Sequence, residues 1–184
     1  AASDVYKRQI YPNAKPNNAH IALAKLEEMG KLKAVITQNI DGLHQMAGSK
    51  NVLELHGSVH RNYCTKCGKF FDLESMLNLG GNIPYCDNCG SIVKPDVVLY
   101  EEALDSDVIT KTISAISNAD LLIIGGTSLA VYPAASFIDY YKGDYIALIN
   151  KANTVYDKSA SLVINKPIGC LLYTSPSPRD TERS

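Results

Sequence analysis

The 184-residue chain contains no tryptophan and only three phenylalanines. It also lacks an excess of either charge, because 18 basic side chains nearly balance 19 acidic ones and the formal net charge is −1. A protein that binds nucleic acid through its phosphates normally shows a basic excess. The charge balance therefore argues against a general nucleic-acid-binding function, and we expect no direct nucleic-acid partner.

Long apolar runs are missing as well. No run reaches the roughly 20 residues that a membrane-spanning helix needs, and the first residues show no signal-peptide pattern, so we expect a cytoplasmic protein without a membrane partner. Apolar residues make up 46% of the chain, which is enough for one domain, or for one domain with a small insert. Four of the five cysteines form two Cys-x-x-Cys pairs, which favours metal binding in a reducing compartment over a disulfide framework.

Apolar strands alternate with helical segments along the chain. The spacing of apolar residues predicts helices over 17–29, 106–117 and 134–141, and strands over 32–37, 52–55, 121–124, 145–149 and 162–164. This alternation predicts an α/β fold in which helices cover both faces of a parallel sheet. Between Gly57 and about Pro95 the apolar periodicity fades, and we expect a segment organised by a metal.

The two cysteine pairs are the strongest single motif, with 18 residues between them. Two tight turns that deliver four thiolates suit tetrahedral zinc, and a full cysteine shell leaves no position for water. We therefore predict one structural Zn²⁺, held by Cys64, Cys67, Cys86 and Cys89. Gly68 and Gly90, one after each pair, suit the turn that each pair requires. Two disulfides or free thiols remain the alternative.

A second motif, TQNIDGLH over 37–44, begins where a predicted strand ends. Ligands bind at the carboxyl ends of strands in open parallel sheets, so these polar residues are candidates for a binding site. An ordinary turn is an equally good interpretation of Asn and Asp-Gly. His56-Gly57 follows the next short strand. A histidine suits a general base at neutral pH, but His20, His44 and His60 share that chemistry.

A glycine-rich turn, Gly125-Gly126-Thr127-Ser128, follows the apolar strand at 121–124. Glycines allow a phosphate to approach the backbone closely, and the two hydroxyls can donate hydrogen bonds. Asn150 closes the next predicted strand, 24 residues after Gly126, near the position where dinucleotide folds place a ribose-binding residue. The pair indicates a dinucleotide site more strongly than the turn does alone.

Taken together, these motifs resemble the sirtuin family in its bacterial type, and the resemblance covers roughly Tyr11 to Gly169. The motifs that carry it, in family order, are TQNIDGLH (37–44), HG (56–57), the two Cys-x-x-Cys pairs, KPDVVLYEE (94–102), GTSLAVYPA (126–134) and LIN (148–150). The resemblance implies a Rossmann-like domain over 10–57 and 96–169 and a zinc-binding domain over 58–95. Segments 1–9 and 170–184 have no helical or strand period, and we expect non-native sequence there in preference to disordered termini.

The resemblance also implies an activity, the NAD-dependent removal of acetyl or other acyl groups from protein lysines, which releases nicotinamide and O-acyl-ADP-ribose. His56 would be the catalytic base, and NAD the co-substrate. The implied NAD-binding residues are Gln38, Asn39, Asp41, Gly126, Thr127, Ser128 and Asn150. The implied substrate-binding strand is Val97, Val98, Leu99 and Tyr100, which would pair with an acyl-lysine peptide or protein.

The chain departs from the family at three places. The family's opening GAGxS loop, which grips the pyrophosphate, has no counterpart here, so we expect poor activity from the 184 residues alone. Glu101 and Ala103 stand where many members have glycine, and the resemblance fades after Gly169. The alternative functions are a catalytically inactive zinc-dependent interaction module, an ADP-ribosyl transferase, or the removal of longer or acidic acyl groups.

Overall fold

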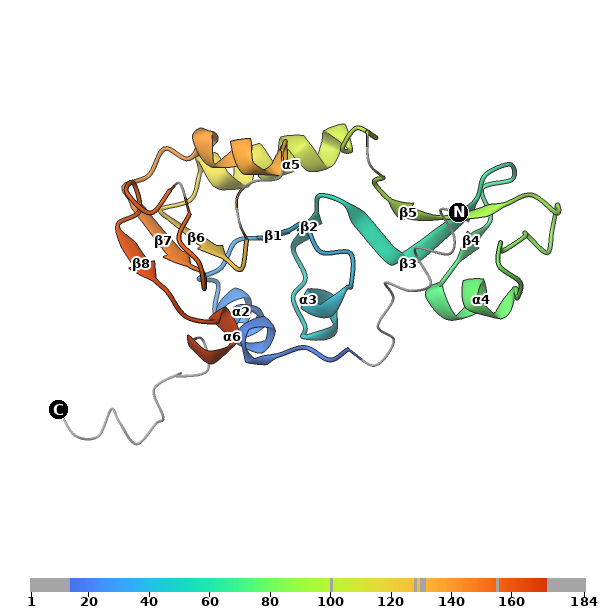
Figure 1. Cartoon of the computed structure of the whole chain (residues 1–184), viewed down its shortest axis with the longest axis horizontal. Helices are drawn as coiled ribbons and strands as arrows, with labels where there is room; N and C mark the ends of the chain where they lie inside the picture. Colours follow the sequence, from blue (N-terminus) through green and yellow to red (C-terminus); the bar gives the residue numbers. More distant parts are fainter. Residues whose placement is uncertain (1–13, 100, 128, 130–131, 155, 172–184) are drawn as a thin grey trace. The chain divides into compact units, whose positions relative to one another are not determined.

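A computed structural model describes residues 14–99, 101–127, 129, 132–154 and 156–171 (Figure 1). Its helical elements are α2 (Asn18–Glu28), α3 (Leu43–Met46), α4 (Leu73–Asn78), α5 (Ser106–Ser117), the 3-10 helix η1 (Ala134–Tyr140) and α6 (Ile168–Leu171). Its strands are β1 (Val35–Thr37), β2 (Val52–Glu54), β3 (Gly57–Cys64), β4 (Phe70–Phe71), β5 (Val93–Val97), β6 (Leu121–Gly125), β7 (Tyr145–Ile149) and β8 (Leu162–Ile164). No helix among the described residues is long and apolar enough to cross a membrane.

The chain divides into two compact units, which we describe separately. The sheet unit comprises the described residues of 16–36, 44–53 and 106–184, and the cysteine unit those of 1–15, 37–43 and 54–105. These units group residues by contact. The functional domain boundaries inferred from the sequence remain a prediction, and segments 1–9 and 172–184 lie outside the described residues.

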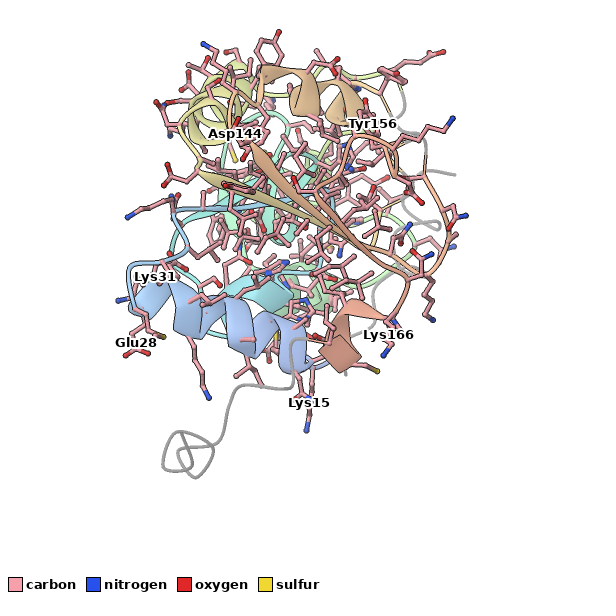
Figure 2. The ribbon with its side chains drawn as sticks, turned by 90° about the vertical axis from the view of Figure 1, so that its left-hand side faces the viewer. Lys15, Glu28, Lys31, Asp144, Tyr156 and Lys166 are labelled. Carbon is pink, nitrogen blue, oxygen red and sulfur yellow. The ribbon has the colours of Figure 1, made fainter. Side chains whose placement is uncertain are left out.

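The sheet unit is built on three parallel strands in the order β6-β7-β8. β-Branched and leucine residues fill these strands, and Leu148 at the centre is only 1% exposed, in contact with Ile124 and Leu129. In Figures 1 and 2, α5 and η1 lie on one side of this sheet and α2 and α6 on the other. The parallel sheet predicted from the alternating pattern is therefore present, with helices on both faces.

Two helical segments of this unit differ from expectation. The segment predicted as a helix over 134–141 is a 3-10 helix, because Ser136 places both its backbone N–H and its hydroxyl on the Pro133 carbonyl, at 3.0 and 2.7 Å. Cys170 and Leu171, expected to belong to a tail without structure, lie in α6. Both donate their N–H to the Pro167 carbonyl, and contacts with α2 support this short helix.

The cysteine unit contains a second sheet, with the strand order β4-β3-β5, in which both pairings are antiparallel. Sequence reasoning expected this region to be organised by metal and missed the eight-residue strand β3. Its inward-facing residues include a polar one, Asn62, which is fully buried and donates its amide to the carbonyls of Val59 and Phe71. A core of Phe71, Met76 and Val93 packs around two of the cysteines, Cys64 and Cys86.

Strand β3 carries a bulge that decides the geometry of the site. Ser58 pairs with Asp96 and Asn62 pairs with Pro95, so residues 59–61 have no partners in the β5 ladder. We refer to residues 59–61 as the β3 bulge. Such bulges redirect side chains and are frequent beside active sites.

Candidate functional site

The four paired cysteines converge in the cysteine unit. Their Sγ atoms all lie within 4.8 Å of one another, with Cys64–Cys89 at 3.3 Å and Cys67–Cys86 at 3.7 Å. A tetrahedral zinc with Zn–S bonds of about 2.3 Å requires sulfurs about 3.8 Å apart. The donor set therefore fits zinc in number, chemistry and spacing, as the sequence predicted.

The two pairs reach this arrangement through the same local turn. In each, the glycine after the second cysteine has a φ near +69° and returns its N–H to the first cysteine, Gly68 to Cys64 at 3.1 Å and Gly90 to Cys86 at 2.8 Å. Side chains other than glycine rarely adopt this φ. The role predicted for the two glycines is therefore confirmed.

The thiols of the cluster differ in acidity. A hydrogen bond from the Ser91 backbone lowers the pKa of Cys89 to about 6, whereas burial raises the pKa of Cys86 to about 11. Metal ligation requires thiolates, so binding must release the protons that remain on the cluster. The donor set would hold zinc closed to substrate, because four protein ligands complete its coordination.

His56 lies two residues after the end of β2, half-buried, and its Nδ1 lies 3.0 Å from the Gln38 carbonyl oxygen. A carbonyl oxygen can only accept, so Nδ1 must carry the proton of this hydrogen bond. In the neutral ring, Nε2 is then the unprotonated nitrogen. The bond thus selects the tautomer in which Nε2 can act as a base.

Gly57 follows His56 for a steric reason. Its φ is +73°, and a Cβ at this position would overlap the Asp96 carbonyl oxygen of β5. Beside this close approach, Val98 donates its N–H to the His56 carbonyl at 3.1 Å. Glycine therefore allows β5 to pass directly beside the candidate base.

The polar loop, residues 38–42, is fastened to the β3 bulge. Val59 donates its N–H to the Ile40 carbonyl at 3.1 Å, and His60 Nε2 lies 3.0 Å from the Asp41 carbonyl oxygen. Asp41 Oδ1 in turn accepts the Leu43 N–H at 3.0 Å, at the start of α3. The structure therefore brings the predicted loop residues and His56 together, although sequence reasoning assigned no role to the bulge.

Arg61, the last residue of the bulge, bridges two carboxylates. Its Nη1 lies 2.6 Å from Glu54 Oε2 and its Nε lies 2.8 Å from Asp96 Oδ2. The Glu54 side chain is only 7% exposed, so its charge depends on partners of this kind. Arg61 therefore ties the strand before His56 to the strand that leads into Val97. The sequence carried no signal for this pairing.

The predicted substrate-binding residues lie at the end of β5, which is the edge strand of its sheet in the part of the chain that the structure describes. The Val98 N–H is donated to the His56 carbonyl, so the alternation of the strand directs the main-chain groups of Val97 toward the opposite edge. Both main-chain groups of Leu99 bond instead to Glu102. Glu102 accepts the Leu99 N–H at 2.9 Å and the Lys94 ammonium at 2.7 Å. Tyr100 lies outside the described residues.

Glu102 and Glu101 are both fixed by local geometry. The Lys94 ammonium and the Leu99 N–H lower the pKa of Glu102. Glu101 has a φ of +69°, a left-handed conformation that strains any residue with a Cβ. This explains why glycine suits position 101 in the family pattern.

A second group of candidates lies in the sheet unit. The register places Gly125 beside Ile149, so Gly126 and Asn150 follow side by side at the carboxyl edge of β6 and β7. Gly126 has a φ of +63° and open space where a Cβ would stand. Thr127 lies next to it and accepts the Leu129 N–H at 3.2 Å. Ser128 lies outside the described residues.

The fold and these sites define a class, an α/β protein of the dinucleotide-binding type that carries a thiolate site suited to structural zinc. The sequence profile of the Sir2 family matches residues 3–133. The chain belongs to the Sir2 family, whose members are the sirtuins.

Among its relatives are two proteins named NAD-dependent protein deacetylase. The one from Clostridium acetobutylicum is 62% identical over 168 residues, which are 91% of this chain and 69% of the relative. The one from Clostridium perfringens is 67% identical over 164 residues, which are 89% and 67% of the two chains. Identity at this level over most of the chain agrees with the family assignment.

Solved structures agree as well. A Sir2 protein with a p53 peptide and NAD+ has a TM-score of 0.85 and 42% identity, covering 91% of this chain and 72% of that one. A Sir2 protein bound to an acetylated peptide has a TM-score of 0.85 and 41% identity, covering 91% and 73%. The predicted Rossmann-like fold is thereby confirmed, and it carries a cysteine cluster that fits a structural zinc site.

Proposed function

We propose that this protein removes acetyl groups from protein lysines at the expense of NAD and releases nicotinamide and O-acetyl-ADP-ribose. The relatives' names and the ligands of the related structures support this reaction. The observation that carries it in this chain is the hydrogen bond between His56 Nδ1 and the Gln38 carbonyl, because it couples a base to the polar loop.

His56 would act as the general base. The acyl oxygen attacks the nicotinamide-bearing carbon of NAD, nicotinamide leaves, and a ribose hydroxyl must then lose a proton to resolve the adduct. His56 Nε2 would take that proton, while Nδ1 stays hydrogen-bonded to the Gln38 carbonyl. The resulting imidazolium donates from both nitrogens, so the bond to the loop strengthens as the charge develops.

The polar loop would orient the nicotinamide and its ribose. The hydrogen bonds that hold the loop are accepted by the backbone carbonyl groups of Gln38, Ile40 and Asp41. The side-chain amides of Gln38 and Asn39 therefore need not hold the loop in place and can serve the ligand. Preorganised donors of this kind contribute to catalysis because they need not reorient during the reaction.

Gly126, Thr127 and Asn150 would bind the adenosine half of NAD. Gly126 and Asn150 lie side by side at the carboxyl edge of parallel strands, the edge at which such folds bind nucleotides. The open space above Gly126 allows a phosphate to approach the backbone. Ser128 is proposed for the same group because of its place in the motif.

The acyl-lysine peptide would add to the edge of β5 that pairs with no other described strand. Main-chain groups of Val97 point to that edge, and Val98, Leu99 and Tyr100 complete the proposed strand. Because main-chain pairing reads little of the peptide sequence, the proposed substrates are acyl-lysine proteins in general. Zinc would stay out of the reaction, and the thiolate site agrees with action in the reducing cytoplasm.

The test measures both products for the complete encoded protein, incubated with NAD and an acetyl-lysine peptide. We expect one nicotinamide and one O-acetyl-ADP-ribose for each lysine released, and no release without NAD. Deacetylation without NAD would contradict the proposal. Transfer of ADP-ribose to the peptide would favour the transferase alternative. If neither product forms, the catalytically inactive interaction module would be the remaining interpretation.

A further inference from the structure

We propose that His60 is a positioning residue, which holds the polar loop in its NAD-binding form through a hydrogen bond to the Asp41 carbonyl. This inference rests on the proposed function, since it assigns the loop to the cofactor. His60 makes this bond from a strand on which no binding residue was expected.

The β3 bulge is what brings His60 to the loop. Residues 59–61 leave the β5 ladder between the pairs Ser58–Asp96 and Asn62–Pro95. Free of that ladder, Val59 turns its N–H to Ile40, and His60 turns its ring to Asp41. A regular strand of the same length would keep both groups in register with β5.

Gly42 shows how closely the His60 ring lies against the loop. A Cβ on Gly42 would come within 2.7 Å of His60 Cδ2 and 2.9 Å of Nε2. The φ of Gly42 is +67°, which also requires glycine. The ring therefore occupies the space beside Gly42 while Nε2 reaches the carbonyl of the preceding residue.

Among the described residues, three groups hold the loop by hydrogen bonds to its carbonyls: His56 at Gln38, Val59 at Ile40 and His60 at Asp41. His56 is the proposed base, and Val59 acts through its backbone, so His60 is the fastening whose side chain can be changed without touching the chemistry. It fixes the carbonyl of Asp41, the same residue whose carboxylate holds Leu43 at the start of α3. Loss of this bond should leave Asp41 held by its side-chain bond to the Leu43 N–H and should make the residue more mobile.

The test compares His60→Ala with His60→Gln in the complete encoded protein. Glutamine can place an amide N–H near the position of His60 Nε2, so it keeps the donor that alanine removes. We expect His60→Ala to raise the KM for NAD about threefold to tenfold, the loss typical of one hydrogen bond. The peptide KM and zinc content should stay unchanged, and His60→Gln should return the NAD KM to within about twofold of the wild type.

Tyr63→Ala is the matched control, because Tyr63 lies on the same strand, is 40% exposed and packs on Phe70. It should leave the KM for NAD unchanged. A wild-type KM in His60→Ala, or a KM in His60→Gln as poor as in His60→Ala, would overturn the proposal.

Hydrogen exchange without NAD separates this inference from the proposed function. His60→Ala should increase amide exchange at Leu43, whose N–H is held by Asp41, and Tyr63→Ala should not. Unchanged exchange at Leu43 would overturn the positioning role whatever the activity. A wild-type protein without NAD-dependent deacetylation would instead overturn the proposed function, and the exchange result would still decide whether His60 holds the loop.

Discussion

Different interactions stabilise each of the two units of the protein. In the sheet unit, Leu148 lies at the centre of a parallel sheet and packs on apolar neighbours, so burial of apolar surface supplies its stability. In the cysteine unit, the buried core includes Cys64 and Cys86 themselves. The core and the metal site of the cysteine unit thus share residues. Loss of the metal should therefore destabilise the cysteine unit far more than the sheet unit.

Removal of zinc should have the largest effect and tests this contrast directly. Structural zinc sites contribute about 10–16 kcal/mol of apparent binding free energy to folding at neutral pH. We expect a strong chelator to abolish hydrogen-exchange protection in β3 and β5 while protection in β6 and β7 persists. Equal loss of protection in both units would contradict the comparison.

Gly57→Ala should have the next largest effect, because its Cβ would overlap the backbone of β5 and its φ is +73°. We expect a loss of at least about 3 kcal/mol in the free energy of unfolding of the cysteine unit. Gly30→Ala is the control in the sheet unit, since Gly30 has a similar φ of +71° but no atom within 4 Å of the added Cβ. Its loss should stay near 1 kcal/mol. Similar losses in urea denaturation of both variants would show that the close approach to Asp96 is unimportant.

The sequence allowed prediction of features that depend on neighbouring residues. The cysteine spacing predicted the thiol cluster, and apolar periodicity predicted the helix Ser106–Ser117 with its bounds unchanged. The β3 bulge could not be predicted, because it depends on the register between β3 and a strand some 30 residues away. From the sequence, the polar Asn62 would be predicted to lie on the surface, because only the structure shows the two carbonyl groups that satisfy its buried amide. The roles of the NAD-binding and substrate-binding residues remain predictions.

Arg61→Ala should have a moderate effect on the cysteine unit. It removes a charged partner of Glu54, whose side chain is nearly buried, and it breaks the ion pair between Arg61 and Asp96 of β5. Because Arg61 is itself partly exposed, we expect a loss of about 1–2 kcal/mol, which urea denaturation can measure. Lys69→Ala, which removes an exposed pair with Asp87, should cost less. The reverse order would show that the Arg61 bridge contributes little.

Glu101→Gly should have the smallest effect, and the opposite sign. The φ of +69° strains glutamate, and glycine relieves that strain, although glycine also gains freedom in the unfolded chain. We expect a net gain of up to about 1 kcal/mol in the stability of the cysteine unit. A loss of stability, measured in the same denaturant series, would show that the Glu101 side chain makes contacts worth more than the strain.

The most direct test of the account is the turnover of His56→Ala in the complete encoded protein. We expect NAD-dependent deacetylation to fall by about 100-fold or more, the contribution typical of a general base, with zinc content and fold retained. His44→Ala should act mainly on packing, because the His44 ring contacts His20 at 4.6 Å between centroids. Near-normal turnover of His56→Ala, with product identities unchanged, would contradict the assignment of His56 as the base.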